Sequence, residues 1–427
     1  MDLVVEETQE ISGKIEPSPS KFHTQFATAA AFLSEGKSVI KSPLRVDDTR
    51  VLAHAIKDMG ATVKRTEKKW TIWGLEDYQN PSGHAFDAKN SPMCLSLMAS
   101  LAAFPSYIMI ITADEQLRQT PVPNLIESLR QLGVEVHSTK QDDTPPLVVF
   151  ESNLKGGKVD FGKNMDPFYL PAALLLMPYA EKKVELVLTP NLKGRFLDAS
   201  VGLMEKGKTG VSVTQRRLRV PPGGFKPLRV TPPLDMFSTL PYVTAAILTS
   251  SKLRISKISH AENVSEFVEV LQKMGVELEQ TSRSIKIPPD QELNSRKIDL
   301  EGYSELLPFL AIMSTTTSGS TRFVNASKAR RMKSDRIKAT VEGLKKMGVN
   351  VTEQEDGLTI EGPTTLKGST VDGHNDDVIV AALGVAGLNA KGTTMIRNKA
   401  EALRRSYPRF VTEFQNLGAN MGYESQF

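Results

Sequence analysis

The sequence of 427 residues has a single cysteine, Cys94, and only 6% aromatic residues. One cysteine excludes an intramolecular disulfide and any zinc site built on cysteines. The six histidines have no HxxxH or HExxH spacing, and no glycine-rich phosphate loop of the P-loop or dinucleotide type is present. We therefore predict a protein without a metal or nucleotide cofactor.

Long runs of one residue type are also missing. No window approaches the roughly 20 apolar residues of a membrane span, and the acidic N-terminus, MDLVVEETQEISGK, has no apolar stretch of signal-peptide length. Lys and Arg number 53 against 49 Asp and Glu, without a basic run of the kind that follows nucleic acid. We expect a soluble, cytoplasmic monomer with neither membrane nor nucleic-acid partners.

The chain does contain a sixfold repeat. An amphipathic helix pattern, with apolar residues at i, i+3 and i+4, is followed each time by a glycine and a short β-branched run. The glycines are Gly60, Gly133, Gly210, Gly275, Gly348 and Gly418. Glycine there favours a left-handed helix cap, and the β-branched residues after it favour a strand. The copy around Gly210, SVGLMEKGKTGVSV, is the weakest of the six.

Each repeat opens with a second helix pattern that is small and apolar all round, such as FATAAAFLSEG or LPYVTAAILTSS. Helices of this kind are expected to be buried. Strand patterns such as EGKSVIKSPL and SKLRISKISH follow these helices. A single core stops growing near roughly 250–300 residues. We therefore predict an α/β fold of two similar domains with three repeats each, residues 21–233 and residues 1–20 plus 234–427.

The residues at the openings of the buried helices are candidates for a site, because free backbone N–H groups and the helix dipole favour anions there. The openings present Lys21, Asn90, Asp166, Asp235, Glu305 and Asp377. Simple N-capping is an equally open interpretation of the Ser, Asn and Asp residues. Lys21 differs, because a cation at a helix N-terminus is unfavourable unless an anion or a carboxylate pairs with it.

Two connecting segments are basic. KARRMKSDR at 328–336 has five basic residues in nine, and EALRRSYPRF at 401–410 has three arginines. They are either solvated basic faces or, since they recur at the same place in successive repeats, an anion site between the two domains. Cys94 lies in the apolar stretch NSPMCLSLM, and we interpret it as a core residue rather than a nucleophile.

Taken together, these segments resemble the enolpyruvyl transferases, most closely the enolpyruvylshikimate phosphate synthases, over nearly the full length. PSKFHTQ with the later DDTR is similar to the family's Gly-Ser-Lys-Ser-x-x-x-Arg opening and its Asp-Asp-x-Arg. KNSPM resembles Gly-Asn-Ser/Ala-Gly-Thr, KARRMKSDRIKA resembles Arg-x-Lys-Glu-Ser/Thr-Asp-Arg, and RRSYPRF resembles Lys-Ser/Thr-Phe/Tyr-Pro. The resemblance implies two domains of three βαβαββ-type units with the active-site cleft between them.

The resemblance also implies an activity. It is the transfer of the enolpyruvyl group of phosphoenolpyruvate, through a tetrahedral intermediate, to a hydroxyl of a shikimate 3-phosphate-like or altered acceptor. The implied catalytic residues are Lys21, Asp235, Glu305 and Lys333. The implied substrate-binding residues are Ser20, Gln25, Asp48, Arg50, Asn90, Ser91, Arg118, Asp166, Phe168, Arg330, Arg336 and Arg405. The expected partners are therefore small anionic substrates.

The sequence departs from the family pattern at several of these positions. Gln25 stands in place of an arginine and Lys333 in place of the catalytic glutamate, while Asp166-Pro167-Phe168 replaces the Ser-Ser-Gln that holds the shikimate phosphate. Asp166 therefore predicts an acceptor with a hydroxyl or amine where shikimate 3-phosphate has its phosphate. The alternative is a non-catalytic paralogue that keeps the fold and binds a small anion. A third hypothesis, a relation to RNA 3′-terminal phosphate cyclases, is disfavoured by the lack of a basic stripe.

Overall fold

The structure is a computed structural model that describes residues 1–74, 84–105 and 107–425. It consists of two compact units. The first unit is Pro19–Pro232, and the second unit combines Met1–Ser18 with Pro233–Phe427. The chain therefore enters the first unit after a short N-terminal segment and returns to the second unit near residue 233. These limits lie close to the predicted domain boundaries, and the independence of the two domains stays a prediction.

The helices alternate between two types along the chain. Those with buried residues on all sides are α1 (Lys21–Leu33), α3 (Pro92–Leu101), α5 (Leu170–Leu176), α7 (Leu240–Leu248), α9 (Leu307–Met313) and α11 (Asp377–Leu388). Those with one buried face are α2 (Asp47–Asp58), α4 (Pro123–Gln131), α6 (Arg195–Lys206), α8 (Val264–Lys273), α10 (Arg336–Lys346) and α12 (Phe410–Asn416). This alternation confirms the predicted pairing of an apolar and an amphipathic helix in each repeat.

Short 3-10 helices occur mainly beside the α-helices. In the first unit they are η1 (Leu117–Gln119), η2 (Pro167–Tyr169), η3 (Met177–Tyr179) and η4 (Pro190–Leu192). In the second unit they are η5 (Met236–Thr239), η6 (Ile258–His260), η7 (Ser304–Leu306), η8 (Ser314–Thr316), η9 (Ser327–Arg331) and η10 (Ala400–Arg405). Three of them, η2, η5 and η7, directly precede the buried helices α5, α7 and α9, so the polar residues of those openings lie on tighter turns.

The strands are short. The first unit has β4 (Lys37–Lys41), β5 (Thr62–Arg65), β6 (Lys69–Trp73), β7 (Ala85–Asp87), β8 (Met109–Thr112), β9 (Val136–Ser138), β10 (Leu147–Val149), β11 (Gly157–Val159), β12 (Val184–Val187), β13 (Ser212–Val213), β14 (Arg217–Val220) and β15 (Arg229–Val230). The second unit has β1 (Asp2–Val5), β2 (Gly13–Ile15), β16 (Leu234–Asp235), β17 (Leu253–Ser256), β18 (Ala261–Glu262), β19 (Glu279–Gln280), β20 (Ser284–Ile287), β21 (Lys297–Asp299), β22 (Gly319–Val324), β23 (Asn350–Gln354), β24 (Gly357–Gly362), β25 (Thr370–Asp372), β26 (Thr394–Arg397) and β27 (Met421–Glu424). Strand β3 (Ser18–Pro19) lies where the chain passes from one unit to the other.

The four-stranded sheets share one topology. Their orders are β15-β4-β6-β5, β7-β8-β10-β9, β11-β12-β14-β13, β2-β17-β20-β19, β21-β22-β24-β23 and β25-β26-β1-β27. The first pair in each order is parallel. The remaining pairs are antiparallel, as a hairpin requires. This confirms the βαβαββ repeat.

Two sheets in the second unit are completed by the N-terminal segment. Strand β1 pairs with β26 and β27 at the other end of the chain, and β2 pairs with β17. In the first unit, β15 at the end of the unit supplies the parallel partner of β4 near its beginning. Strands β1 and β2 are thus part of the second unit's fold.

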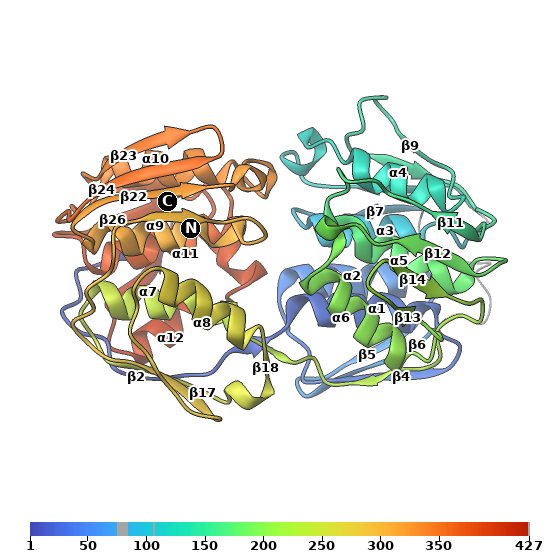
Figure 1. Ribbon diagram of the computed structural model, residues 1–427, viewed down its shortest axis with the longest axis horizontal. Coiled ribbons are helices and arrows are strands. Elements are labelled where there is room, and N and C mark those ends of the chain that lie inside the picture. The colour runs from blue at the N-terminus through green and yellow to red at the C-terminus, as the bar shows by residue number, and fades with distance from the viewer. Residues whose placement is uncertain (75–83, 106, 426–427) are drawn as a thin grey trace. The chain divides into compact units, whose positions relative to one another are not determined.

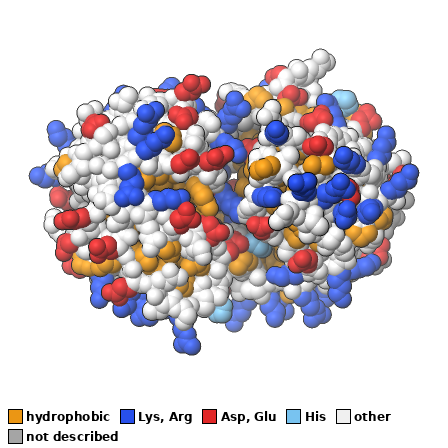
Figure 2. Space-filling view, in the orientation of Figure 1, with side chains coloured by type: hydrophobic (Ala, Val, Ile, Leu, Met, Phe, Trp, Pro, Cys, Tyr) orange, Lys and Arg blue, Asp and Glu red, His pale blue; other side chains and the backbone are white. Residues whose placement is uncertain are grey.

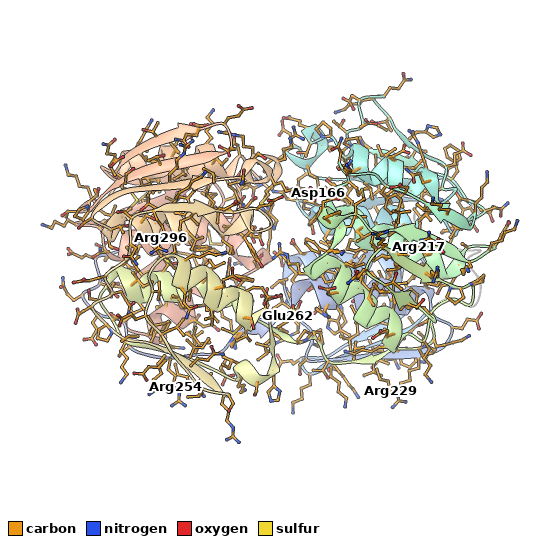
Figure 3. The ribbon with its side chains drawn as sticks, viewed as in Figure 1. Asp166, Arg217, Arg229, Arg254, Glu262 and Arg296 are labelled. Atoms are coloured by element: carbon orange, nitrogen blue, oxygen red, sulfur yellow. The ribbon has the colours of Figure 1, made fainter. Side chains whose placement is uncertain are left out.

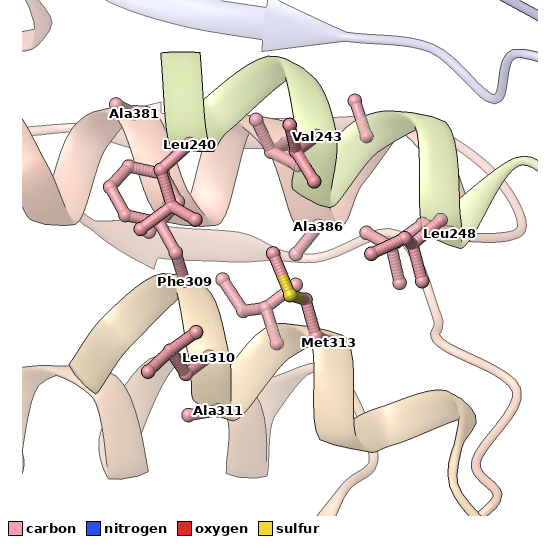
Figure 4. Packing of buried hydrophobic residues seen from close by; sticks show 14 of the residues in the cluster. Leu240, Val243, Leu248, Phe309, Leu310, Ala311, Met313, Ala381 and Ala386 are labelled. Carbon is pink, nitrogen blue, oxygen red and sulfur yellow. The ribbon is translucent and has the colours of Figure 1, made fainter. Parts of the chain in front are cut away.

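The buried helices make up the centre of each unit. Figure 1 shows α7, α9 and α11 inside the second unit, with the β22–β24 sheet on one side and β2 and β17 on the other. Figure 4 shows Leu240 and Val243 of α7 facing Phe309 and Met313 of α9, with the small side chain of Ala386 close to them. Small residues allow these helices to approach closely, and the apolar sequence is explained by burial on every side.

Most of the predicted glycines occupy the left-handed position just after their helix, with φ between 87° at Gly275 and 112° at Gly60. The weak copy is an exception. Helix α6 ends at Lys206, and the left-handed residue that follows its cap is Lys208, at φ 54°. Gly210 has φ 73° but lies beyond that cap, so the predicted helix-capping role of Gly210 is wrong.

In the described ranges, none of the helices has the length and apolarity that crossing a membrane requires.

Candidate active site

Lys21 is the first residue of α1, and its charge is balanced by a carboxylate from the next helix. The Ser20 side chain caps α1 by accepting a hydrogen bond from the His23 backbone N–H. Lys21 Nζ lies 3.1 Å from Asp48 Oδ2 of α2, and the lysine side chain remains 31% exposed while Asp48 is buried. The Asp48 carboxylate thus provides the pairing that a cation at a helix N-terminus requires.

Gln25 lies one turn further along α1 and is buried. Its amide Nε2 donates to Cys94 Sγ at 3.2 Å and lies 3.5 Å from the backbone oxygen of Asp48. The Cys94 thiol donates to that same oxygen at 2.9 Å. The neutral amide therefore joins α1 to α2 and α3, at the position where the family resemblance implies a guanidinium.

Cys94 is fully buried in α3, which confirms that it is a core residue. Burial, and to a lesser extent the nearby Asp48 carboxylate, raise the pKa of the Cys94 thiol to about 12. The thiolate, which is the reactive form, is accordingly scarce at neutral pH.

We expect Cys94 in the folded protein to react with a chromogenic disulfide reagent at pH 8 about a thousandfold more slowly than in the unfolded chain, because the raised pKa removes most of the thiolate. Absorbance of the released thiol, followed with and without denaturant, checks this. Equal rates in the two conditions would contradict the assignment of Cys94 to the core.

Asn90 and Ser91 open α3. Ser91 caps the helix by accepting from the Cys94 backbone N–H at 3.4 Å. The Asn90 side-chain amide donates to Gln116 Oε1 at 3.2 Å, and Asn90 is almost fully buried. Cys94 thus links α1 to the opening of α3. Its backbone N–H donates to Ser91, and its Sγ accepts from the Gln25 amide.

Asp166 acts as a cap at the start of η2. Its Oδ1 accepts from the Phe168 backbone N–H at 3.0 Å, and its own N–H donates to Asn124 Oδ1 at 3.0 Å. The Phe168 ring makes edge-on contacts with Tyr169 and Phe196. Asp166 is half-buried, and Figure 3 labels its position in the first unit.

Arg50 and Arg118, the two remaining predicted binding residues of the first unit, are exposed. The Arg50 side chain is 52% exposed and lies 3.7 Å from Asp47 on its own helix. Arg118 belongs to η1, where its backbone N–H donates to the Asp114 oxygen and its oxygen accepts from Lys140 Nζ. Among the described residues, neither guanidinium group is hydrogen-bonded to Lys21, Asp48 or Gln25.

In the second unit, the Asp376 carboxylate at the start of α11 receives a dense set of donors. Arg336 donates two hydrogen bonds, from Nε at 2.8 Å and from Nη2 at 2.9 Å, and both residues are buried. The Ser334 hydroxyl and the Val378 backbone N–H also donate to Asp376, each at 2.9 Å. The free-energy cost of removing these two charges from water is offset by their mutual attraction and hydrogen bonds, so loss of either partner leaves an uncompensated buried charge.

Lys333 and Asp377 form a second buried pair beside the first. Lys333 Nζ lies 2.8 Å from Asp377 Oδ1, with the lysine side chain 9% and the aspartate 2% exposed. The Ser406 hydroxyl donates to Asp377 Oδ2. The lysine that replaces the family's glutamate therefore has a carboxylate partner in this chain.

The two other arginines predicted here, Arg330 and Arg405, each bind both backbone and side-chain oxygens. Arg330 donates to the oxygens of Gln354 at 2.6 Å and Glu355 at 2.8 Å, and its Nη1 lies 2.8 Å from both Asp335 and Glu353 carboxylates. In a separate bond set, Arg405 donates to the backbone oxygen of Asn375 at 2.7 Å and to its side-chain oxygen at 2.9 Å. These bonds fix the two basic segments to the rest of the second unit, so neither is a purely solvated basic face.

Tyr407 lies among the same carboxylates. Burial raises the pKa of Tyr407 far above its usual range, the Asp377 carboxylate raises it further, and Arg336 opposes this. Asp235 and Asp376 act on Tyr407 in the same direction as Asp377. The phenol is therefore protonated at neutral pH and can donate a hydrogen bond.

Asp235 and Glu305 stand on the 3-10 turns that precede α7 and α9. Asp235 caps η5 by accepting from the Phe237 backbone N–H at 3.0 Å. Glu305 is the central residue of η7 and is partly exposed.

The sequence did not reveal Asp376, Ser334, Ser406 or Tyr407 as members of this cluster. The run NDDV before α11 was recognised as a helix opening only. Its adjacent aspartates were the available signal, because two buried carboxylates in succession require cations nearby, and the segment 328–336 supplies them. Among the described residues, no group of three or more His, Cys, Asp or Glu could hold a metal ion.

Comparison with known proteins connects both units to one family. The family model described as EPSP synthase (3-phosphoshikimate 1-carboxyvinyltransferase) matches residues 5–414. The 3-phosphoshikimate 1-carboxyvinyltransferase of Methanococcus vannielii is 28% identical over 98% of this chain and 99% of its own length. That of Acetivibrio thermocellus is 30% identical over 96% of this chain and 97% of its own length.

Solved structures have the same fold. An EPSP synthase from Acinetobacter baumannii superposes with a TM-score of 0.77 at 21% identity, covering 99% of this chain and 100% of that one. The enolpyruvyl transferase NikO from Streptomyces tendae gives a TM-score of 0.79 at 19% identity, covering 99% and 98% of the two chains. At 19–21% identity these structures establish only the fold. Membership of the family rests on the sequence match over residues 5–414.

Proposed function

The chain belongs to the EPSP synthase family, and we propose that it transfers the enolpyruvyl group of phosphoenolpyruvate to a hydroxyl of a shikimate 3-phosphate-like acceptor. The observation that carries this proposal is Lys21 at the start of α1, whose ammonium lies beside the Asp48 carboxylate and whose side chain is 31% exposed. A cation at that place suits an anionic substrate such as phosphoenolpyruvate. We further propose that the protein is a monomer, which light scattering would test.

The reaction is an addition followed by an elimination, and both steps move protons. The acceptor hydroxyl loses its proton and adds to C2 of phosphoenolpyruvate, while C3 gains a proton to become a methyl group. The C2–O bond to phosphate then breaks, C3 loses a proton, and inorganic phosphate leaves. We assign Lys21, Asp235 and Glu305 to these transfers, because an ammonium and carboxylates can donate and accept protons.

The second unit's arginines fit a positioning role within this proposal. Arg336 donates to the Asp376 carboxylate, and Arg405 donates to the Asn375 backbone oxygen. These bonds fix the residues at the start of α11. Lys333 is likewise paired with Asp377. We propose that this network holds Tyr407 and the neighbouring carboxylates in a fixed arrangement for the substrate.

Release of inorganic phosphate from phosphoenolpyruvate tests the function. We expect release to depend on an acceptor, and the assay should compare shikimate 3-phosphate with shikimate and with related amines and alcohols. Absence of release with every acceptor, in a protein that melts cooperatively, would contradict the proposal. The alternative of a non-catalytic paralogue predicts a ligand-induced rise in melting temperature without turnover, and the homologues, which are named as transferases, lend it no support.

Acceptor choice should respond to the charge of Asp166. We expect Asp166→Ser to lower the KM for shikimate 3-phosphate by roughly tenfold, because the serine can keep the cap on η2 while the repulsion of the acceptor phosphate is removed. Steady-state kinetics with shikimate 3-phosphate and with shikimate check the prediction, since only the phosphorylated acceptor should gain.

The matched control is Asp142→Ser. Asp142 also accepts a backbone N–H two residues on, from Thr144, in the turn between β9 and β10 of the same unit. This variant removes an equal charge from a loop away from the openings of the buried helices, although Asp142 Oδ1 also accepts from the Ser138 and Thr144 hydroxyls. The same KM change in both variants, or no change in either, would refute the role of Asp166 in acceptor choice.

A further inference from the structure

The second unit contains a basic cavity that the proposed transfer reaction does not use. It has a volume of about 560 Å³ and is lined by Lys14, Arg254, Ser256, Lys257, Ser259, His260 and Arg283. These residues come from β2, from the end of β17, from the η6 turn and from the loop before β20. Figure 3 shows Arg254 at the edge of this unit, and in Figure 2 Lys and Arg side chains occur along that edge among acidic and apolar ones.

The sheet beside the cavity has three cations in one row. Arg254 of β17 is in register with Lys14 of β2 on one side and with Lys286 of β20 on the other. Like charges directly opposite one another on neighbouring strands are destabilising. Lys286 is compensated by Glu279 at 3.1 Å, whereas Arg254, at the centre of the row, has no carboxylate within ion-pair distance among the described residues.

A single carboxylate, Glu16, compensates the lysines of the cavity. It lies 2.7 Å from Lys257 Nζ and 3.4 Å from Lys14 Nζ. The hydrogen bond from Lys257 lowers the pKa of Glu16, which is therefore ionised at neutral pH. Within the described ranges, the guanidinium groups of Arg254 and Arg283 have neither a hydrogen bond nor an ion pair, so four permanent cations face one anion.

From this arrangement we propose that the cavity is a binding site for a small ligand carrying two or more phosphate groups. Guanidinium groups bind phosphate oxygens through paired N–H donors, and two of them are available here. The lining has hydroxyls and the His260 imidazole but none of the larger Phe, Tyr or Trp rings, so we assign recognition to the phosphates rather than to a nucleobase. The cations line a cavity instead of a stripe, which distinguishes the site from a nucleic-acid surface.

Calorimetric titration with inorganic tripolyphosphate tests the site, with the full chain at low ionic strength. We expect binding to the native protein and a loss of affinity of at least about tenfold in the double variant Arg254→Gln/Arg283→Gln. The matched control is Arg296→Gln, which removes one exposed arginine elsewhere on the same unit and should leave the affinity unchanged. Affinity should also fall as salt is added, since the contacts are ionic.

Glu16→Gln provides a test in the opposite direction. Removing this carboxylate frees Lys14 and Lys257, so the affinity for tripolyphosphate should rise by about three- to tenfold. Arg254→Gln alone should keep or raise the melting temperature without ligand, because it relieves the row of like charges. A gain of affinity in one variant and a loss in another cannot both come from misfolding.

Three results would overturn the proposal. Binding that persists unchanged in the Arg254→Gln/Arg283→Gln variant belongs to another place, such as the proposed substrate site. Equal weakening by Arg296→Gln would mean diffuse attraction to a basic surface. Failure of the native protein to bind tripolyphosphate would remove the site altogether, and none of these results would bear on enolpyruvyl transfer, since the variants avoid every residue assigned to it.

Discussion

Replacing Arg336 by methionine is expected to lower the free energy of unfolding by about 3–5 kcal/mol, because Asp376 would be left charged and buried without its partner. Asp376 is fully buried and receives two of its hydrogen bonds from Arg336. The Ser334 hydroxyl and the Val378 N–H alone cannot replace a cation. Denaturant unfolding followed by circular dichroism measures the loss.

The double variant Arg336→Met/Asp376→Ser separates the buried charge from simple loss of contacts. It removes both charges and retains a hydroxyl that can cap α11. We expect it to recover most of the stability that the single variant loses, since a buried pair replaced as a whole is often nearly neutral. If Arg336→Met unfolds no more easily than the exposed control Arg296→Gln, the ion pair does not stabilise the second unit.

Replacing Lys21 by methionine is expected to lower kcat/KM for enolpyruvyl transfer by about a thousandfold, which is within the range for loss of a group that moves a proton. Lys21→Arg keeps the positive charge beside Asp48. We expect its KM to stay close to the native value while its kcat falls, since an arginine binds anions but does not exchange its proton readily. Initial rates at varied phosphoenolpyruvate concentration measure both constants.

Stability must be measured alongside these rates. Asp48 is buried, so Lys21→Met should also cost about 1–3 kcal/mol of folding free energy. The control is Lys89→Met, which breaks the exposed Lys89–Asp87 pair in the same unit and should change neither rate nor stability appreciably. A kcat/KM for Lys21→Met within tenfold of the native value would refute the catalytic assignment of Lys21.

Much of the fold can be predicted from the sequence because local residue patterns indicate the helices and strands of each repeat. An apolar helix such as α11 can only be stable when it is buried, and a glycine such as Gly348 marks the end of its helix. Strand β8 pairs with β7 and β10 as its counterparts in the other repeats do. The failure at Gly210 has a local cause, since Lys208 adopts the left-handed conformation itself.

The site was less accessible to sequence reasoning because its bonds join distant segments. Arg336 and Asp376 are 40 positions apart, and the residue types alone could not show that the arginine serves a carboxylate of the protein. Lys333 was noted as a departure from the family pattern, but its compensation by Asp377 required the structure. Lys21 was correctly expected to need a partner, and the structure identifies Asp48 among its neighbours.

The most direct measurement of the proposed function is mass spectrometry of the acceptor after incubation with the protein and phosphoenolpyruvate. The account predicts an acceptor heavier by one enolpyruvyl group, formed in equal amount with inorganic phosphate, and absent with the Lys21→Met variant. An unmodified acceptor in every case, or phosphate released without a new product, would contradict enolpyruvyl transfer by this protein.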